Sequence, residues 1–168
     1  MKEEIKFIFN NITEWLKFAE AKHAGLMFLN SGLLFGMFTA LKDYEKFFPK
    51  SVIFISFFCF GLSMLFSLIS LFPITSNAMK GREPIENPNI HFTGHLCRLE
   101  VHELKSELAK IYPDCTFDKS DEDLMNQIIV NSYITARKYK IFKLAIFSTS
   151  VGIVIPLLVV LIEMVFTS

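Results

Sequence analysis

The stretch VIFISFFCFGLSMLFSLISLF, residues 52–72, is 21 residues long and contains no charged side chain. An α-helix rises about 1.5 Å per residue, so about 20 apolar residues are needed to cross the hydrocarbon core of a bilayer. Two other runs come close to that length: residues 24–41, with 18 residues, and residues 144–162, with 19. The sequence therefore predicts a small integral membrane protein with three transmembrane helices.

Composition supports this class. Of the 168 residues, 52% are hydrophobic and 19 are Phe, and the mean hydropathy of +0.41 is high for a soluble domain. The 17 basic and 17 acidic residues cancel, so the chain has no general basic field for nucleic acid. Cys59, Cys97 and Cys115 are odd in number and unpatterned. This argues against a disulfide framework and fits a reducing compartment.

The chain divides into four segments, all expected to be helical. We predict an N-terminal amphipathic helix over residues 1–23 and a transmembrane hairpin of two helices over residues 24–72. A small helical cytosolic region that senses a ligand follows over residues 73–143, and the third transmembrane helix covers residues 144–166. The fold class is an all-α membrane protein.

The first and last helices carry clear local signals. Ile5, Ile8 and Ile12 recur at helical spacing, so this face either packs on the soluble region or lies on the membrane surface. Ser120 and Asp123 resemble a capping box that starts the last helix. Nothing breaks this helix before Pro156, so we expect it to continue unbroken from the cytosolic region into the membrane.

Basic residues near the span ends predict the orientation. The loop of residues 42–51 contains Lys42, Lys46 and Lys50. A larger set would lie on the opposite side of the membrane: Lys17, Lys22, Lys80, Arg82, Arg137, Lys138, Lys140 and Lys143. Since the more basic side stays in the cytoplasm, we expect a cytoplasmic N-terminus and an external C-terminus.

Small and polar residues mark the predicted spans. Gly32 and Gly36 are four residues apart, a spacing that lets helices approach closely in lipid. Asn30 is an amide inside a span and should face protein or water, where it takes part in packing or gating. Ser63 and Ser67 share a face of the second span with Ser70. This face either packs against other helices or lines a water path in an oligomer.

Catalytic and metal sites are not predicted. His91, His95, Cys97 and His102 include metal-binding residue types, but Gly94 separates the first two and no second ligand cluster follows. The sequence has no phosphate-binding loop and no nucleophile motif. We therefore expect neither an enzyme nor a bound cofactor.

An anionic ligand is the better candidate. Arg137 and Lys138 belong to a basic cluster where the last helix enters the membrane; this cluster either anchors the chain to anionic lipid or neutralises a ligand together with Arg98. His91 and Phe92, in the turn before the first soluble helix, are further candidate contacts.

Four stretches carry a family resemblance: AEAKHAGLMFLNSG at residues 19–32, SLISLFP at 67–73, NIHFTGHLCRL at 89–99 and ITARKYKIFKLA at 134–145. In this order the chain resembles the transmembrane effectors of bacterial Pycsar antiphage defence. His95 stands where the family pattern has an acidic residue.

This resemblance implies a function. Such effectors sense cyclic CMP or cyclic UMP made by a partner pyrimidine nucleotide cyclase, and then disrupt the bacterial inner membrane. Three helices cannot enclose a pore of useful width, so we expect a homo-oligomer in the lipid bilayer. Two alternatives stay open: a related membrane effector that responds to another nucleotide or to a protein sensor, and a passive subunit of a membrane complex.

Overall fold

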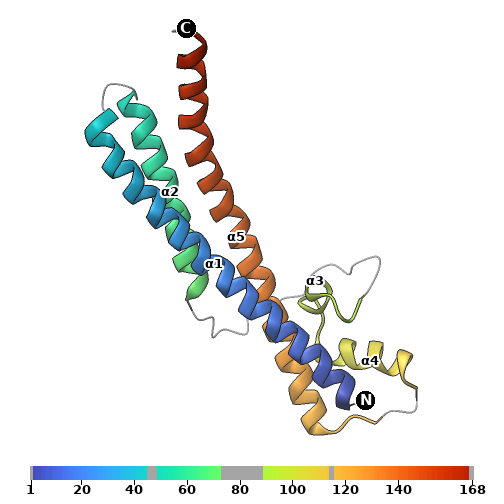
Figure 1. The fold of residues 1–168 in the computed structure, drawn as a ribbon. Helices are drawn as coiled ribbons and strands as arrows, with labels where there is room; N and C mark the ends of the chain where they lie inside the picture. Colours follow the sequence, from blue (N-terminus) through green and yellow to red (C-terminus); the bar gives the residue numbers. More distant parts are fainter. Residues whose placement is uncertain (1, 45–48, 73–88, 114–115, 167–168) are drawn as a thin grey trace. The chain divides into compact units, whose positions relative to one another are not determined.

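The structure, a computed structural model, describes residues 2–44, 49–72, 89–113 and 116–166. These residues contain the helices α1 (Lys2–Tyr44), α2 (Lys50–Leu71), α3 (Thr93–Leu96), α4 (Val101–Ile111) and α5 (Lys119–Phe166), and no strand (Figure 1). The predicted all-α class is confirmed. Lys46, Lys80, Arg82 and Cys115 lie outside the described residues.

The chain forms two compact units. Unit 1 combines Met1–Glu20 with Pro73–Tyr139, and unit 2 combines Ala21–Phe72 with Lys140–Ser168. Helices α1 and α5 each contribute residues to both units. The expectation that α5 continues unbroken to Pro156 is confirmed, since this proline lies inside the helix.

Unit 1 has an apolar core of the kind found in soluble proteins. Ile5, Ile8 and Ile12 on α1 are fully buried. They belong to one cluster with residues of α3, α4 and α5, namely Leu96, Leu104, Leu108, Met125, Ile128 and Ile129. The apolar face of the N-terminal helix therefore packs on the rest of its own unit.

Carboxylates cap the first turns of α4 and α5. Glu100 and Glu103 form a reciprocal capping box at the start of α4, and the Glu100 amide donates to the Glu103 carboxylate at 2.7 Å. At α5 the box is formed by Asp118 and Asp121, whose backbone amides each donate to the other's carboxylate. The predicted box of Ser120 and Asp123 is wrong, because the helix already begins at Lys119 and Ser120 lies inside it.

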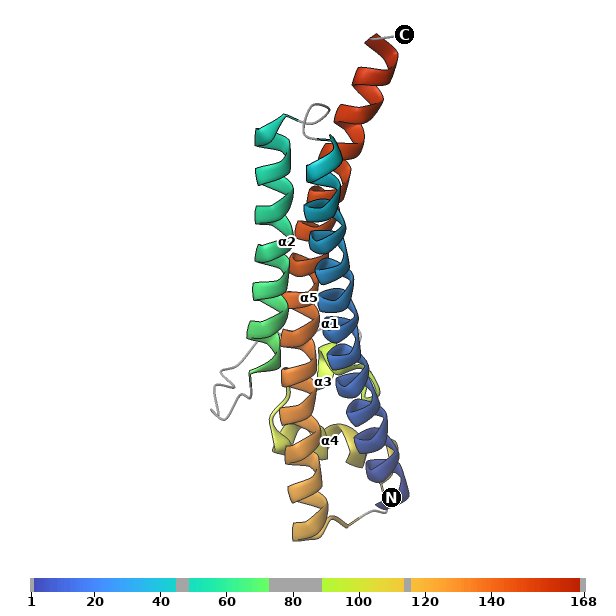
Figure 2. The same ribbon diagram turned by 60° about the vertical axis from the view of Figure 1, so that its left-hand side comes forward.

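Unit 2 places α2 beside parts of α1 and α5 (Figures 1 and 2). The buried residues of α2 recur every three or four positions: Val52, Ser56, Phe60, Ser63, Ser67 and Ser70. Four of these are serines, whereas large apolar side chains face outward, with Phe28 84% and Phe54 72% exposed. A polar interior and an apolar exterior invert the usual arrangement of a soluble protein and suit a lipid environment.

Among the described residues, α2 and α5 are long and apolar enough to cross a membrane. The first predicted span, residues 24–41, lies in α1, which is not one of these two helices. Two helices of this length and hydropathy agree with the predicted membrane class, and the span in α1 stays a prediction.

Gly152 of α5 lies directly against Phe60 and Cys59 of α2. A Cβ atom added there would lie 2.8 Å from the Phe60 ring and 3.1 Å from the Cβ of Cys59. By contrast, a Cβ added to Gly61 on α2 would meet no atom within 4 Å. Gly152 therefore sets how closely these two helices pack.

A Gly152→Leu substitution should lower the thermal unfolding temperature of the detergent-purified protein, since the larger side chain must displace Phe60 or the helix. Overpacking of this kind costs about 1–3 kcal/mol. Gly61→Leu is the matched control and should leave the unfolding temperature nearly unchanged. Equal unfolding temperatures for the two variants would contradict the assigned packing.

Candidate functional site

A polar cluster in unit 2 joins three helices. The Asn30 amide of α1 donates to the Ser63 hydroxyl of α2 at 2.9 Å. The Thr149 hydroxyl of α5 lies 2.9 Å from the Asn30 carbonyl oxygen and 2.8 Å from the Ser63 hydroxyl. All three side chains are at most 1% exposed. The prediction that Asn30 faces protein or water holds: its partners are two hydroxyls of the same chain.

One arrangement of protons satisfies the whole cluster. A hydroxyl group can donate one hydrogen bond while it accepts others. Asn30 donates to Ser63, Ser63 to Thr149 and Thr149 to the Asn30 carbonyl, which closes a ring. Neighbouring bonds in such a ring polarise one another. The ring fixes the register of α1, α2 and α5 within unit 2.

Two other buried hydroxyls on α2 differ from this ring. The hydroxyl oxygens of Ser56 and Ser67 are buried and make no hydrogen bond with the described part of the chain. The Ser148 hydroxyl of α5, by contrast, has a partner, because it donates to the Cys59 carbonyl of α2 at 2.8 Å. The serine face of α2 thus combines packing contacts with unused hydrogen-bonding capacity.

Gly32 and Gly36 lie on an exposed face of α1. A Cβ atom added at either position would meet no described atom within 4 Å. Close packing within this chain therefore uses Gly152 and not these two glycines. A role of Gly32 and Gly36 in contacts between chains stays a prediction.

Of the predicted basic residues of α5, Arg137 and Lys138 lie at the end of unit 1, and Lys140 and Lys143 lie at the start of the α5 segment of unit 2. Lys138 is only 5% exposed, and its ammonium forms an ion pair with Glu20 of α1 at 3.2 Å. Trp15 and Tyr139 make an edge contact in the same unit. Arg137 is half-buried. Because a buried cation needs a partner, Glu20 compensates for the burial of Lys138.

The residues predicted in the turn before the first soluble helix lie close to α1. His91 is 3.7 Å from Glu4 and makes an edge contact with the Phe7 ring. Phe92 and Arg98 are exposed. The role of His91, Phe92, Arg98, Arg137 and Lys138 as ligand contacts stays a prediction.

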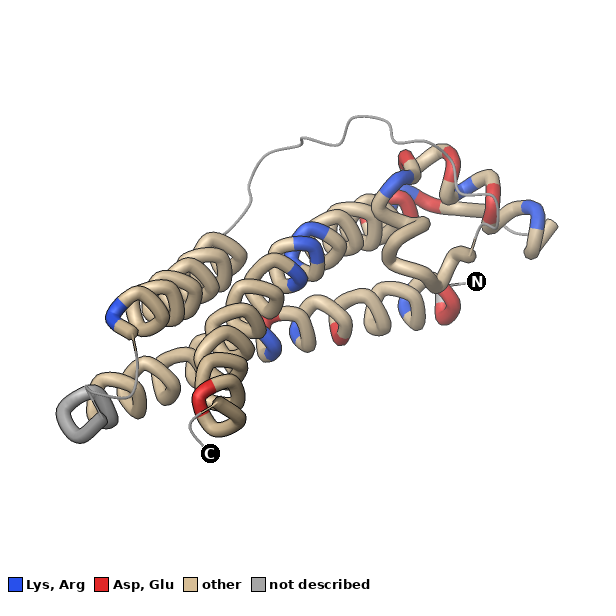
Figure 3. Tube along the Cα trace, turned by 90° about the horizontal axis from the view of Figure 1, so that it is seen from above, with Lys and Arg blue, Asp and Glu red and all other residues tan. Residues whose placement is uncertain are grey.

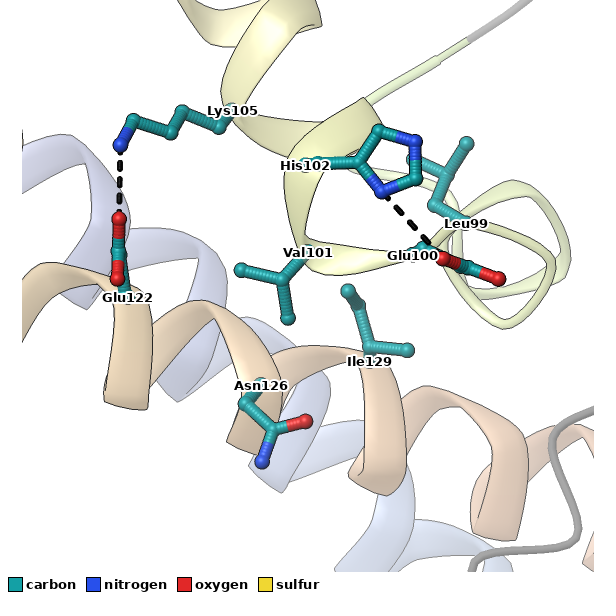
Figure 4. Close-up of a pocket in the computed structure, with 8 residues that line it drawn as sticks. All are labelled: Leu99, Glu100, Val101, His102, Lys105, Glu122, Asn126 and Ile129. Carbon is teal, nitrogen blue, oxygen red and sulfur yellow. Dashed lines mark hydrogen bonds and ion pairs between the residues drawn. The ribbon is translucent and has the colours of Figure 1, made fainter.

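Sequence reasoning missed a cavity in unit 1. It has a volume of about 530 Å³ and lies between α4 and α5 (Figure 4). Its lining residues are Leu99, Glu100, Val101, His102, Lys105, Glu122, Asn126 and Ile129. Arg98, a predicted contact, directly precedes this lining in the chain. The sequence does not predict this cavity, because its polar residues are of types that are common on any protein surface. Lys105 and Glu122, which meet across it, are also 17 positions apart in the chain.

An ion pair holds the two walls of this cavity together. The Lys105 ammonium donates to the Glu122 carboxylate at 2.7 Å. This hydrogen bond and the charge of Lys105 lower the pKa of Glu122 from its usual value. Glu122 is therefore an anion at neutral pH. On the opposite rim, His102 lies 3.3 Å from Glu100.

Another buried pair lies in the same unit. His95 is 4% exposed, and its Nε2 atom lies 2.9 Å from the Glu107 carboxylate. Cys97 donates to the Gly94 carbonyl at a sulfur–oxygen distance of 3.4 Å. These contacts join the short helix α3 to α4 and to its own turn, and so they have a structural role.

Charge separates the two units. Lys, Arg, Asp and Glu are spread along the elements of unit 1, whereas α2 carries charge only at Lys50, its first residue (Figure 3). Charged residues are thus frequent in unit 1 and nearly absent from α2.

Asn30→Leu should destabilise the protein, because it removes two of the three bonds in the ring. Such hydrogen bonds between membrane helices are worth about 0.6 kcal/mol on average. The unfolding temperature in detergent is the measurement. Ser31→Ala is the control: its exposed hydroxyl bonds to the Met27 carbonyl of its own helix, so its loss should have little effect. A more stable Asn30→Leu variant would contradict the ring.

Comparison with known families yields one match. The family model described as the Pycsar effector protein domain matches residues 4–165. Neither a curated protein nor a solved structure matches the chain.

Proposed function

The chain belongs to the Pycsar effector family, whose model covers nearly all of it, and we propose that it senses a cyclic pyrimidine mononucleotide and disrupts the bacterial inner membrane. The ligand is cyclic CMP or cyclic UMP, made by a partner pyrimidine nucleotide cyclase during phage infection. The chain itself is the downstream effector and carries no catalytic step.

The observation that carries this proposal is the contrast between the two units within one family domain. Unit 1 is charged, has its own apolar core and contains a solvent-connected cavity. Unit 2 has a buried polar ring and exposed phenyl groups, as expected of a helix bundle in lipid. Helices α1 and α5 contribute to both units, so ligand binding has a covalent route to the membrane segments.

The proposed orientation places unit 1 in the cytoplasm. Lys17, Arg137, Lys140 and Lys143 then lie on the cytoplasmic side, in agreement with the positive-inside rule. The basic cluster at the end of unit 1 contacts anionic lipid headgroups, which attract Lys and Arg near the surface. The N-terminus is cytoplasmic in this arrangement, as a cytosolic second messenger requires.

The active state is proposed to be a homo-oligomer. Three helices of one chain are too few to enclose a pore of useful width. Gly32 and Gly36 present an open face of α1 that a second copy can approach closely. A ligand that favours this assembled state shifts the population toward it by its difference in affinity.

A thermal-shift titration of the detergent-purified full chain tests the ligand. Cyclic CMP or cyclic UMP should raise the unfolding temperature, because a ligand that binds only the folded state stabilises it by mass action. Cyclic AMP and a cyclic dinucleotide are the comparison ligands. A shift with the dinucleotide alone would favour the alternative of an effector for another nucleotide, and no shift with any of them would favour a protein sensor or a passive subunit.

The oligomer is tested with proteoliposomes that contain a fluorescent dye. Gly32→Leu should abolish ligand-triggered dye release while the thermal shift with ligand remains, because the bulky side chain blocks helix approach and not the ligand site. Gly61→Leu, which also faces open space, is the matched control and should release dye like the unmodified chain. Full dye release by Gly32→Leu would exclude this packing face.

A further inference from the structure

We infer that the cavity between α4 and α5 is the nucleotide site of this chain, and that the ligand's phosphate takes Lys105 away from Glu122. This inference rests on the proposed function and adds to it the location of the ligand and the contact that the ligand replaces. The residues that carry it are Lys105, Glu122 and Asn126, which line the cavity together with apolar side chains (Figure 4).

The size of the cavity suits one small nucleotide. Its volume of about 530 Å³ lies in the range of about 300–1,000 Å³ that is usual for small-molecule sites. Leu99 and Val101, both half-buried, supply apolar surface for a planar base. Asn126 offers an amide that can both donate and accept, which matches the mixed edge of a pyrimidine.

The cavity lining offers one ammonium, Lys105, which can pair with a single phosphodiester, and two carboxylates, Glu100 and Glu122, which disfavour any further negative charge. Lys105 is the Lys or Arg side chain among the lining residues, and a cyclic mononucleotide carries one negative charge. A cyclic dinucleotide carries two negative charges and would leave one of them beside Glu100 or Glu122. An ammonium is an effective point-charge partner for phosphate oxygens.

The two carboxylates also have a part in this site. Once the phosphate pairs with Lys105, Glu122 needs a new hydrogen-bond donor, and a ribose hydroxyl or a base amine can supply it. Glu100 already has a neighbour in His102 at 3.3 Å. The Lys105–Glu122 ion pair joins α4 to α5, so its replacement changes how these two helices are held within unit 1.

The cavity and the basic run of α5 cannot serve the same ligand molecule. Asn126 and Arg137 are 11 residues apart on one helix, which is about 16 Å of helical rise. A mononucleotide is too short to bridge them. Lys138 is in addition buried and paired with Glu20. The cavity is the better site, because 39% of the Lys105 side chain is exposed and can reach a ligand.

The test compares variants of the full chain by thermal-shift titration with cyclic CMP and with cyclic UMP. Lys105→Ala should raise the concentration of ligand at half-maximal shift by about tenfold or more, as expected for the loss of a charge-assisted bond. Asn126→Ala should raise it by about fivefold. Asn126 is exposed, so this variant should keep the unfolding temperature of the ligand-free protein.

Two further variants complete the comparison. Lys110→Ala removes an exposed lysine from the last turn of α4, outside the cavity lining, and should bind ligand like the unmodified chain. Arg137→Ala should also keep its ligand response if the cavity is the site. Each shift is measured against the ligand-free form of the same variant, so a loss of stability is not mistaken for a loss of binding.

The outcomes separate the site from the function. Weaker binding in Lys105→Ala and Asn126→Ala, with normal binding in Lys110→Ala and Arg137→Ala, supports the cavity. Normal binding in both cavity variants, with loss in Arg137→Ala, overturns the cavity and leaves the proposed function intact. No shift of the unmodified chain with either nucleotide overturns the proposed function and this inference together.

Discussion

A polar side chain among apolar membrane helices must find its hydrogen-bond partners within the protein, because lipid offers none. Asn30, Ser63 and Thr149 meet this requirement together, one from each of three helices. Their ring sets the register of α1, α2 and α5. The serine face of α2 then points inward together with Phe60, and Phe54 and Phe58 point outward. Gly152 makes this register possible, since Phe60 and Cys59 occupy the space where a side chain would stand.

In unit 1, the other parts of α1 and α5 meet a different requirement. There water is available, so the apolar residues of α1 and α5 turn inward and form a core with α4. Charged residues stay at the surface or form pairs. Lys138 is buried, and its ion pair with Glu20 compensates for its charge. Residues of α1 and α5 thus follow opposite rules of burial on either side of Glu20 and Tyr139, where the chain passes from unit 1 to unit 2.

A ligand site formed by an ion pair has a physical consequence for a sensor. Without ligand, Lys105 and Glu122 pair with each other between α4 and α5, beside the apolar core that packs the two helices together. An anionic ligand must compete with Glu122, so its net gain is the difference between two charge-assisted bonds and not the whole of one. For the proposed site, this difference predicts a moderate affinity and a coupling of ligand binding to the position of α4. The response of such a sensor depends on how differently its two states bind the ligand.

The sequence by itself determined the helical class, the membrane character of residues 52–72 and the unbroken course of α5, because hydrophobic runs and helix breakers act locally. It also identified Asn30 as a residue that needs a partner, and the resemblance in four stretches identified the family. Which hydroxyls would meet Asn30 was decided by tertiary structure, since Ser63 and Thr149 are 33 and 119 residues away. The capping box of α5 is formed by Asp118 and Asp121 and not by the predicted Ser120 and Asp123, because several carboxylates within one turn can take this role. The cavity appeared only when α4 packed on α5, because Lys105 and Asn126 have no local signal that distinguishes them from other surface residues. Residue types and periodicity are encoded along the chain, but a site made by two helices exists only where packing brings their faces together.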